Sequence, residues 1–138
     1  MKVLIDTNVI IDYLADREPF ADQAEKIIEL CESGELTGLL TASAATDVYY
    51  ILRKQEGHAK TLEYLRTLFS VLDIVEVSKN DLLRAMELDM PDFEDALVSQ
   101  CAKRAKAEQI VTRNSQDFLR SAVPPISPEE LLHRFFPE

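Results

Sequence analysis

The chain has 138 residues, of which 46% are hydrophobic, so it can bury one substantial core and is too short for two ordinary domains. Its 25 acidic and 15 basic side chains give a formal net charge of −10, which argues against binding nucleic acid by general electrostatics. No apolar run approaches the roughly 18 residues of a membrane span, and the first residues lack the apolar stretch of a secretory signal. We therefore expect a cytoplasmic protein with a single domain over residues 1–138 and no membrane contact.

The first segment is a short apolar run that ends at an acid. Residues 3–5 do not alternate between apolar and polar, which favours a strand buried on both faces of a parallel sheet. Asp6 then lies at the carboxyl end of that strand, where open α/β sheets bind their ligands. Residues 9–14 predict a first helix, with Asn8 available as its N-cap.

Strands and helices alternate along the rest of the chain. Apolar residues at helical spacing, separated by charged ones, predict helices over residues 19–33, 44–54, 59–68, 78–88 and 92–106, and from residue 127 onward. Short apolar runs predict strands at residues 39–40, 74–77 and 109–112. This alternation predicts an α/β fold, a three-layer α/β/α sandwich around a short, mainly parallel sheet.

Two of these helices carry strong start signals. Ser78 and Asp81 have the spacing of a capping box. The segment Ser127-Pro-Glu-Glu130 combines the same spacing with a proline at the first helical position. Both signals indicate where a helix begins, whatever its function.

Four acids fall at strand ends or in the first turn of the adjoining helices: Asp6, Asp47, Asp95 and Asp117. In a parallel sheet with right-handed crossovers these ends lie on one edge, so we expect the carboxylates to converge. Packed carboxylates repel one another, and a divalent cation relieves that repulsion. Oxygen ligands without His or Cys suit Mg²⁺ or Mn²⁺, which usually bind a substrate phosphate as well. The arrangement therefore predicts phosphoryl chemistry.

Several of these acids also have a purely structural interpretation. Acids favour the first turn of a helix because they offset its dipole, so Asp47 alone is as consistent with structure as with function. Asp92 and Asp95 have capping spacing, and we assign Asp92 to the cap and Asp95 to the metal. Glu94 is turned roughly 100° from Asp95 around the helix and is expected in solvent.

The remaining two acids differ in how easily structure explains them. Asp117 has the position of a cap for a short turn before Phe118. Asp6 has the weakest structural explanation, because no propensity favours an acid at the end of a buried strand. Asn8 can both cap a helix and hold a carboxylate or a metal-bound water.

Three blocks of this sequence resemble the signature blocks of PIN domains, in order and at fitting distances. They are Leu4-Ile-Asp-Thr-Asn-Val9, Asp92-Phe-Glu-Asp-Ala-Leu97 and Ile110-Val-Thr-Arg-Asn-Ser-Gln-Asp-Phe118. The resemblance spans essentially the whole chain and implies a metal-dependent ribonuclease fold, related to flap nucleases and found in VapC-type toxins of toxin–antitoxin pairs. By the family motif, Asp6, Asp95 and Asp117 correspond to its acidic site, and Asp47 to the acid of its third helical segment.

The chain departs from the family motif at two positions. Many members have Glu where this chain has Asp47, and a shorter arm reaches less far toward an ion. Many also have Asp where this chain has Asn114, so that Asp117 supplies the last acid instead.

The resemblance implies hydrolysis of phosphodiester bonds in single-stranded RNA, with Mg²⁺ or Mn²⁺ as cofactor. Asp6 and Asp95 would hold the ion, and Asp117 or Asp47 would complete its shell or orient the attacking water. We place Asp117 with the metal ligands. The expected partners are the RNA, an antitoxin protein and a second copy of the chain.

Around the acids, Asn8, Asp92, Thr112 and Asn114 are expected to support the site. Arg113 beside the crevice is the best placed cation for a substrate phosphate. A solvated loop arginine is an equally good interpretation of Arg113.

Other classes of protein share parts of this pattern. A receiver-type signalling domain also gathers acids around Mg²⁺, yet it needs a lysine at the end of the last strand, where this chain has Thr112, Arg113 and Asn114. A dehalogenase-type phosphatase needs a second Asp at position 8, which is Asn here. A catalytically silent PIN-like module that binds RNA or a protein is the main alternative to the enzyme.

Overall fold

The computed structural model describes residues 1–137, and its helices and strands alternate along the chain. The strands are β1 (Lys2–Ile5), β2 (Thr37–Thr41), β3 (Asp73–Val75), β4 (Gln109–Val111) and β5 (Pro125–Ile126). The helices are α1 (Thr7–Leu14), α2 (Ala21–Ser33), α3 (Ala42–Glu56), α4 (His58–Val71), α5 (Lys79–Glu87), α6 (Phe93–Arg104) and α7 (Pro128–Phe135), with a short 3₁₀ helix η1 (Ser115–Phe118).

The five strands form one sheet in the order β3-β2-β1-β4-β5, and every neighbouring pair is parallel. β1 lies in the middle, where Val3 is opposite Gly38 of β2 on one side and Gln109 of β4 on the other. The edge strand β5 was not predicted, because two residues that begin with proline give no strand pattern. Otherwise the predicted three-layer α/β/α architecture is confirmed.

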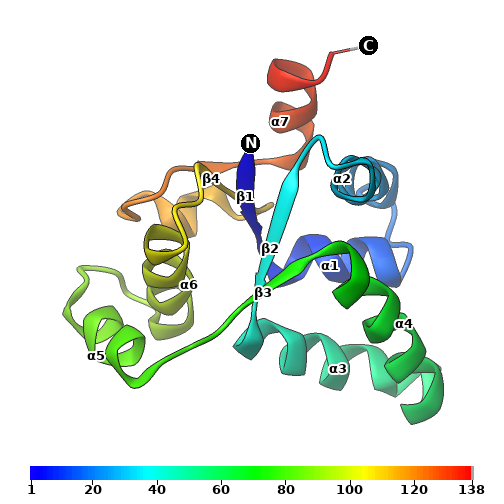
Figure 1. Ribbon diagram of the computed structural model, residues 1–138, viewed down its shortest axis with the longest axis horizontal. Helices are drawn as coiled ribbons and strands as arrows, with labels where there is room; N and C mark the ends of the chain where they lie inside the picture. Colours follow the sequence, from blue (N-terminus) through cyan, green and yellow to red (C-terminus); the bar gives the residue numbers. More distant parts are fainter. Residues whose placement is uncertain (138) are drawn as a thin grey trace.

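Each face of the sheet packs against its own layer of helices (Figure 1). Val3 and Ile5 of β1 point into a core shared with α1, α2, α3, α4 and α7. Leu4, between them, points into a second core shared with α5, α6 and η1. Residues 3–5 are therefore buried on both sides, as their continuous apolar character predicts.

Two helices begin earlier than their apolar pattern predicts. The N-cap of α1 is Asp6 and not Asn8, because Asp6 Oδ1 accepts a hydrogen bond from the Thr7 N–H at 2.9 Å. Thr41 caps α3, which begins at Ala42, and its Oγ1 accepts from the backbone of Ala44 at 3.2 Å. As a result, Asp47 lies in the second turn of α3, whereas the sequence predicts that it lies in the first.

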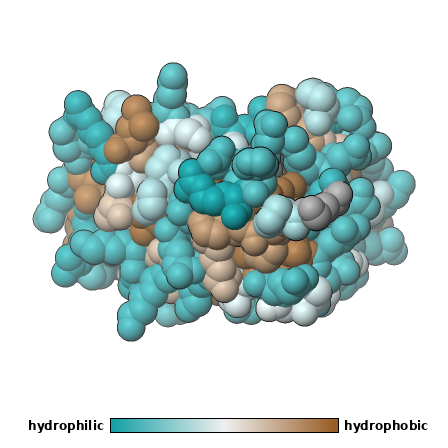
Figure 2. All heavy atoms as spheres, turned by 90° about the horizontal axis from the view of Figure 1, so that it is seen from above, coloured by the Kyte–Doolittle hydropathy of each residue, from teal (hydrophilic) through white to brown (hydrophobic). Residues whose placement is uncertain are grey.

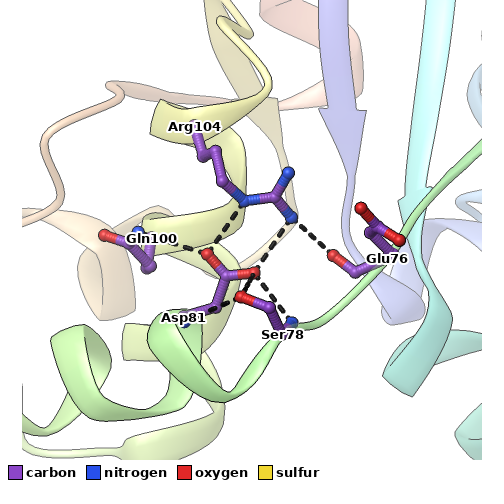
Figure 3. A network of polar contacts seen from close by, with 5 residues as sticks. All are labelled: Glu76, Ser78, Asp81, Gln100 and Arg104. Atoms are coloured by element: carbon purple, nitrogen blue, oxygen red, sulfur yellow. Dashed lines mark hydrogen bonds and ion pairs between the residues drawn. The ribbon is translucent and has the colours of Figure 1, made fainter.

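The capping box that begins α5 is confirmed and belongs to a larger network (Figure 3). The fully buried Asp81 accepts from the backbone and hydroxyl of Ser78, both at 3.0 Å. It also receives Arg104 Nε and Nη2 from the last turn of α6, each at 2.9 Å, and Gln100 Nε2 at 3.3 Å. The Arg104 guanidinium holds the pKa of the Asp81 carboxyl well below its usual range. This network fastens α5 to α6.

The end of the molecule that carries the chain's N-terminus and α7 is mostly hydrophilic, with smaller hydrophobic areas and one larger area near the centre of the view (Figure 2). Leu30 of α2, together with Leu132 and Phe136 at the end of the chain, lines a cavity on this side of the fold. Within residues 1–137, no helix has both the length and the apolar character needed to cross a membrane.

Candidate active site

A cavity of about 370 Å³ opens where the carboxyl ends of β1 and β2 meet the first turns of α1, α3 and α6. Its acidic lining residues are Asp6, Asp47, Glu94 and Asp95. Hydroxyl and apolar side chains complete the wall, among them Thr41, Ser43, Tyr50, Ile51 and Leu97. The structure thus brings three of the four predicted acids into one cavity, although they are spread over ninety positions of the chain.

The Asp6 carboxylate is held by hydrogen bonds on both oxygens. Oδ1 accepts from the Thr7 N–H, while Oδ2 accepts from Thr112 Oγ1 at 2.8 Å and from Asn8 Nδ2 at 3.2 Å. Burial raises the pKa of Asp6, and the hydrogen bond from Thr112 acts in the opposite direction. Asp117 raises this pKa further. Asp6 is therefore a fixed carboxylate whose negative charge is only partly compensated.

The residues predicted to support the site lie around Asp6. Thr112 Oγ1 also accepts the Asn114 N–H at 3.0 Å, and Asn8 Oδ1 accepts the Arg113 N–H at 3.4 Å. The Asp6 N–H donates to Val111 O at 2.9 Å, so the end of β4 is tied to the end of β1. These bonds fix the last predicted block of the sequence beside the first.

Asp92 caps α6 as predicted, while the metal-binding role of Asp95 stays a prediction. Asp92 is the N-cap, and its Oδ1 accepts the Asp95 N–H at 2.9 Å. Asp95 lines the cavity, and burial raises its pKa to about 6, with further contributions from the charges of Asp92, Asp117 and Asp6. Burial and these neighbouring charges together favour the neutral form of the Asp95 carboxyl, and a bound divalent cation would act in the opposite direction.

Glu94 is a further acid of the cavity, which the sequence does not predict. The side chain is exposed, as predicted, but it also lines the cavity, and the nearby Asp47 raises its pKa. The helical rotation between Glu94 and Asp95 does not separate them here, because both belong to the first turn of α6, whose end faces the cavity. The available signal was its place directly beside Asp95 in the second motif block.

Asp117 lies in η1 and lines a neighbouring cavity, together with Met90, Gln116 and Leu119. Its charge still acts on both Asp6 and Asp95, whose pKa values it raises. The fourth acid therefore lies outside the cavity that holds the other three, but near enough for its charge to act on Asp6 and Asp95.

The donor set suits an open site for a divalent cation and does not form a closed one. Within residues 1–137, no three Asp, Glu, His or Cys side chains are close enough to enclose an ion by themselves. Proteins usually hold Mg²⁺ by one or two carboxylates, while water and substrate phosphate supply the other ligands. Asp6 and Asp95, two oxygen donors with raised pKa values in one cavity, fit that description.

Arg113 is not the free cation that the sequence predicts. Its Nε donates to Asp12 Oδ2 at 2.5 Å and its Nη2 to Asp12 Oδ1 at 3.2 Å, and the guanidinium lies 4.0 Å from the centre of the Phe20 ring. Asp12 is only 1% exposed, and a buried carboxylate requires such a partner. An acid inside the apolar run of α1 was the signal that could have predicted this pair.

The fold and the cavity define an α/β protein with an acid-lined site at the carboxyl edge of a parallel sheet. Comparison with protein families gives this class a name, because a family model described as PIN domain matches residues 2–116. The chain belongs to the PIN domain family, as its three sequence blocks predict.

Known proteins resemble the chain over most of its length. Ribonuclease VapC1 from Aquifex aeolicus (strain VF5) is 26% identical over 139 residues, which cover 97% of this chain and 95% of that protein. A toxin–antitoxin complex from Klebsiella pneumoniae contains a chain with a TM-score of 0.68 and 22% identity, covering 91% of this chain and 97% of that one. VapC20 from Mycobacterium tuberculosis, described as a toxin that cleaves the sarcin–ricin loop, has a TM-score of 0.63 and 14% identity, with 78% and 86% covered. These two structures share the fold.

Proposed function

We propose that the whole chain is one nuclease domain, a Mg²⁺- or Mn²⁺-dependent endoribonuclease that hydrolyses phosphodiester bonds of single-stranded RNA. The observation that carries the proposal is the pair Asp6 and Asp95, two carboxylates with raised pKa values in one cavity at the carboxyl edge of the sheet. A bound divalent cation would offset their repulsion. The similarity to Ribonuclease VapC1 supports RNA as the substrate.

Asp6 and Asp95 would hold the ion, and Asp117 would act on it from the neighbouring cavity. A divalent cation held there would lower the pKa of a bound water and polarise the scissile phosphate. Asp47, which lines the same cavity from α3, would accept a hydrogen bond from the attacking water and so orient it.

The supporting residues keep these carboxylates in place. Thr112 and Asn8 hold Asp6, Asn114 holds Thr112, and Asp92 fixes the first turn of α6 on which Asp95 lies. Arg113 contributes by its charge, which lowers the pKa of Asp6, while its guanidinium binds Asp12. We therefore assign Arg113 to positioning the site and not to binding the substrate.

We also infer that the chain is the toxin of a toxin–antitoxin pair, which acts in the cytoplasm and forms a homodimer. The solved complex from Klebsiella pneumoniae and the toxin VapC20 share its fold, which supports an antitoxin protein as a partner. Coexpression with the product of the neighbouring reading frame, followed by copurification, tests this assignment.

The test of the enzyme uses purified chain, a labelled single-stranded RNA and Mn²⁺. Cleavage should stop in excess EDTA and in Asp95→Asn, and should persist in Asp73→Asn, which makes the same change at an exposed acid of β3. Undiminished cleavage in excess chelator would overturn the metal mechanism. RNA binding without any cleavage would instead identify a catalytically silent PIN-like module.

A further inference from the structure

One face of α3 begins at the acidic cavity and continues toward the C-terminal end of the helix. Asp47, Tyr50, Ile51 and Lys54 are spaced three or four residues apart, so their side chains lie on the same side of α3. The first three line the cavity. Tyr50 is 57% exposed and Ile51 is 42% exposed, so an apolar surface adjoins the acids.

The Tyr50 ring contacts two neighbouring side chains of α3, Arg53 and Tyr49. The Arg53 guanidinium lies 5.3 Å from the centre of the Tyr50 ring and 5.9 Å from that of Tyr49. The two tyrosine rings meet edge to face, and the Tyr49 hydroxyl lies 2.7 Å from His58 Nδ1. Tyr50 is thus an exposed aromatic ring held by its neighbours, which reduces the entropy lost when a ligand binds it.

Basic side chains follow the ring along α3. Arg53 and Lys54 are exposed, and neither forms an ion pair with another residue in the range 1–137. On a chain with a net charge of −10, such local cations are the groups that can attract a phosphate backbone.

We propose that Tyr50 stacks against a base of the RNA next to the scissile phosphate, and that Lys54 and Arg53 bind phosphates of the nucleotides beyond it. This inference rests on the proposed ribonuclease function and names the part of the site that holds the substrate. Stacking tolerates any base because every base has a π-face, and an adjacent basic track follows the backbone. The acids then face the scissile phosphate while α3 holds the strand.

The stacking is tested by binding, in an Asp95→Asn background that leaves the RNA intact. Fluorescence anisotropy with a labelled oligoadenylate should give a Kd roughly tenfold larger for Tyr50→Ala than for the parent. Tyr50→Leu should increase the Kd to a similar extent. Tyr50→Phe keeps the ring and should bind as the parent does. Phe69→Ala removes an exposed ring from α4, outside the cavity, and should change nothing.

The proposed phosphate contacts of Arg53 and Lys54 are tested by the salt dependence of the same Kd. Removing one phosphate contact from a single strand lowers the slope of log Kd against log[salt] by about 0.7. We expect this change for Lys54→Ala. Lys103→Ala, at the far end of α6 from the cavity, should leave the slope unchanged.

Folded Tyr50→Ala and Tyr50→Leu proteins with the parental Kd would overturn the proposal. It would also be wrong if these variants changed the oligomeric state on gel filtration and left the Kd unaltered, since the face would then be a protein interface. Cleavage by the unsubstituted chain separates the two levels of inference. If the unsubstituted chain cleaves RNA with Mn²⁺ while Tyr50→Ala binds RNA as tightly as the parent, only the stacking proposal is wrong. If the unsubstituted chain binds RNA without cleaving it, the proposed ribonuclease activity is wrong.

Discussion

At the scale of single residues, Asp6 uses one carboxylate for two purposes. Oδ1 caps α1 and Oδ2 receives Thr112 and Asn8, while the group as a whole faces the acidic cavity. The cap anchors the carboxylate at the end of β1, so the local structure and the proposed chemistry depend on the same atoms.

Asp92 and Asp95 allow the cap and the proposed ligand to be separated. Asp92→Asn keeps a good N-cap, so we use Asp92→Ala, which should lower the free energy of unfolding by about 1 kcal/mol and leave cleavage largely intact. Asp95→Asn should abolish cleavage without loss of stability, because it removes a repelled charge. Urea unfolding and RNA cleavage assays measure both. Equal loss of activity with unchanged stability in the two variants would contradict this division.

The pair of Arg113 and Asp12 gives a second prediction. Arg113→Ala leaves the buried Asp12 carboxylate without its partner and should destabilise the fold by about 3–5 kcal/mol. Arg113→Ala combined with Asp12→Leu removes both charges and should recover much of that loss. Urea unfolding of the single and double variants provides the measurement. A single variant as stable as the parent would show that solvent or another cation compensates Asp12.

The sequence predicts that Asp6, Asp47 and Asp95 lie together better than it predicts the partner of Arg113 or the position of Glu94. Asp6, Asp47 and Asp95 share a cavity because parallel strands place their carboxyl ends on one edge, and that rule needs only the order of elements. The partner of Arg113 depends on how α1 lies against the end of β4, which no local pattern specifies. The position of Glu94 depends in the same way on where the end of α6 points.

At the scale of elements, α5 and α6 are joined by the buried Asp81 and the last turn of α6 (Figure 3). The two helices pack on the same face of the sheet and belong to the same core as Leu4. Because α6 also carries Asp92 and Asp95 at its other end, this network helps fix the direction in which α6 meets the cavity.

The Asp81 network has a defined pH dependence. The pKa of Asp81 is lowered in the folded state, so the unfolded chain binds the proton more readily and the stabilisation is present above the unfolded pKa of about 4. It is lost as the pH falls below that value. Asp81→Asn should therefore destabilise the fold at about pH 7, and the difference from the parent should shrink toward about pH 3.

Urea unfolding at several pH values measures this effect. Asp89→Asn provides the control. Both side chains of the Asp89–Arg120 ion pair are exposed, so this pair should contribute little to stability at any pH. A constant difference between Asp81→Asn and the parent at all pH values would show that the carboxylate charge is not what stabilises the network.

The elements themselves follow from the sequence wherever packing leaves a periodic pattern. The helices α2, α5 and α6 are predicted closely, since their apolar faces and capping residues point to the same boundaries. The starts of α1 and α3 are missed because side chains at the strand ends, Asp6 and Thr41, cap these helices earlier. Strand β5 exists only through its pairing with β4, a contact that a local pattern does not contain.

At the scale of the whole molecule, the acidic cavity should link stability to the proposed metal ion. Asp6→Asn keeps an N-cap, because Asn caps about as well as Asp, but it removes a charge from the cavity. The metal-free variant should therefore melt at a higher temperature than the parent. The parent should gain about 2.7 kcal/mol at one hundred times the dissociation constant of Mn²⁺, and the variant should lose most of that gain.

Thermal melts of both proteins, in EDTA and in Mn²⁺, measure both effects together. Asp73→Asn serves as the control for removing one negative charge elsewhere. If Asp6→Asn shows the same rise with Mn²⁺ as the parent, Asp6 is not a ligand.

The position of β1 at the centre of the sheet also bears on how the chain is made. Asp6 is synthesised well before Val111 and Thr112, yet the N–H of Asp6 bonds to Val111 and its carboxylate to Thr112. At ordinary rates of translation, on the order of ten seconds separate the synthesis of the two ends of this site. Until β4 emerges, β1 has an open edge and Asp6 lacks the hydroxyl that holds it. A ribosome that stalls before residue 109 therefore releases a fragment without the assembled site, and such a fragment should lack the proposed activity.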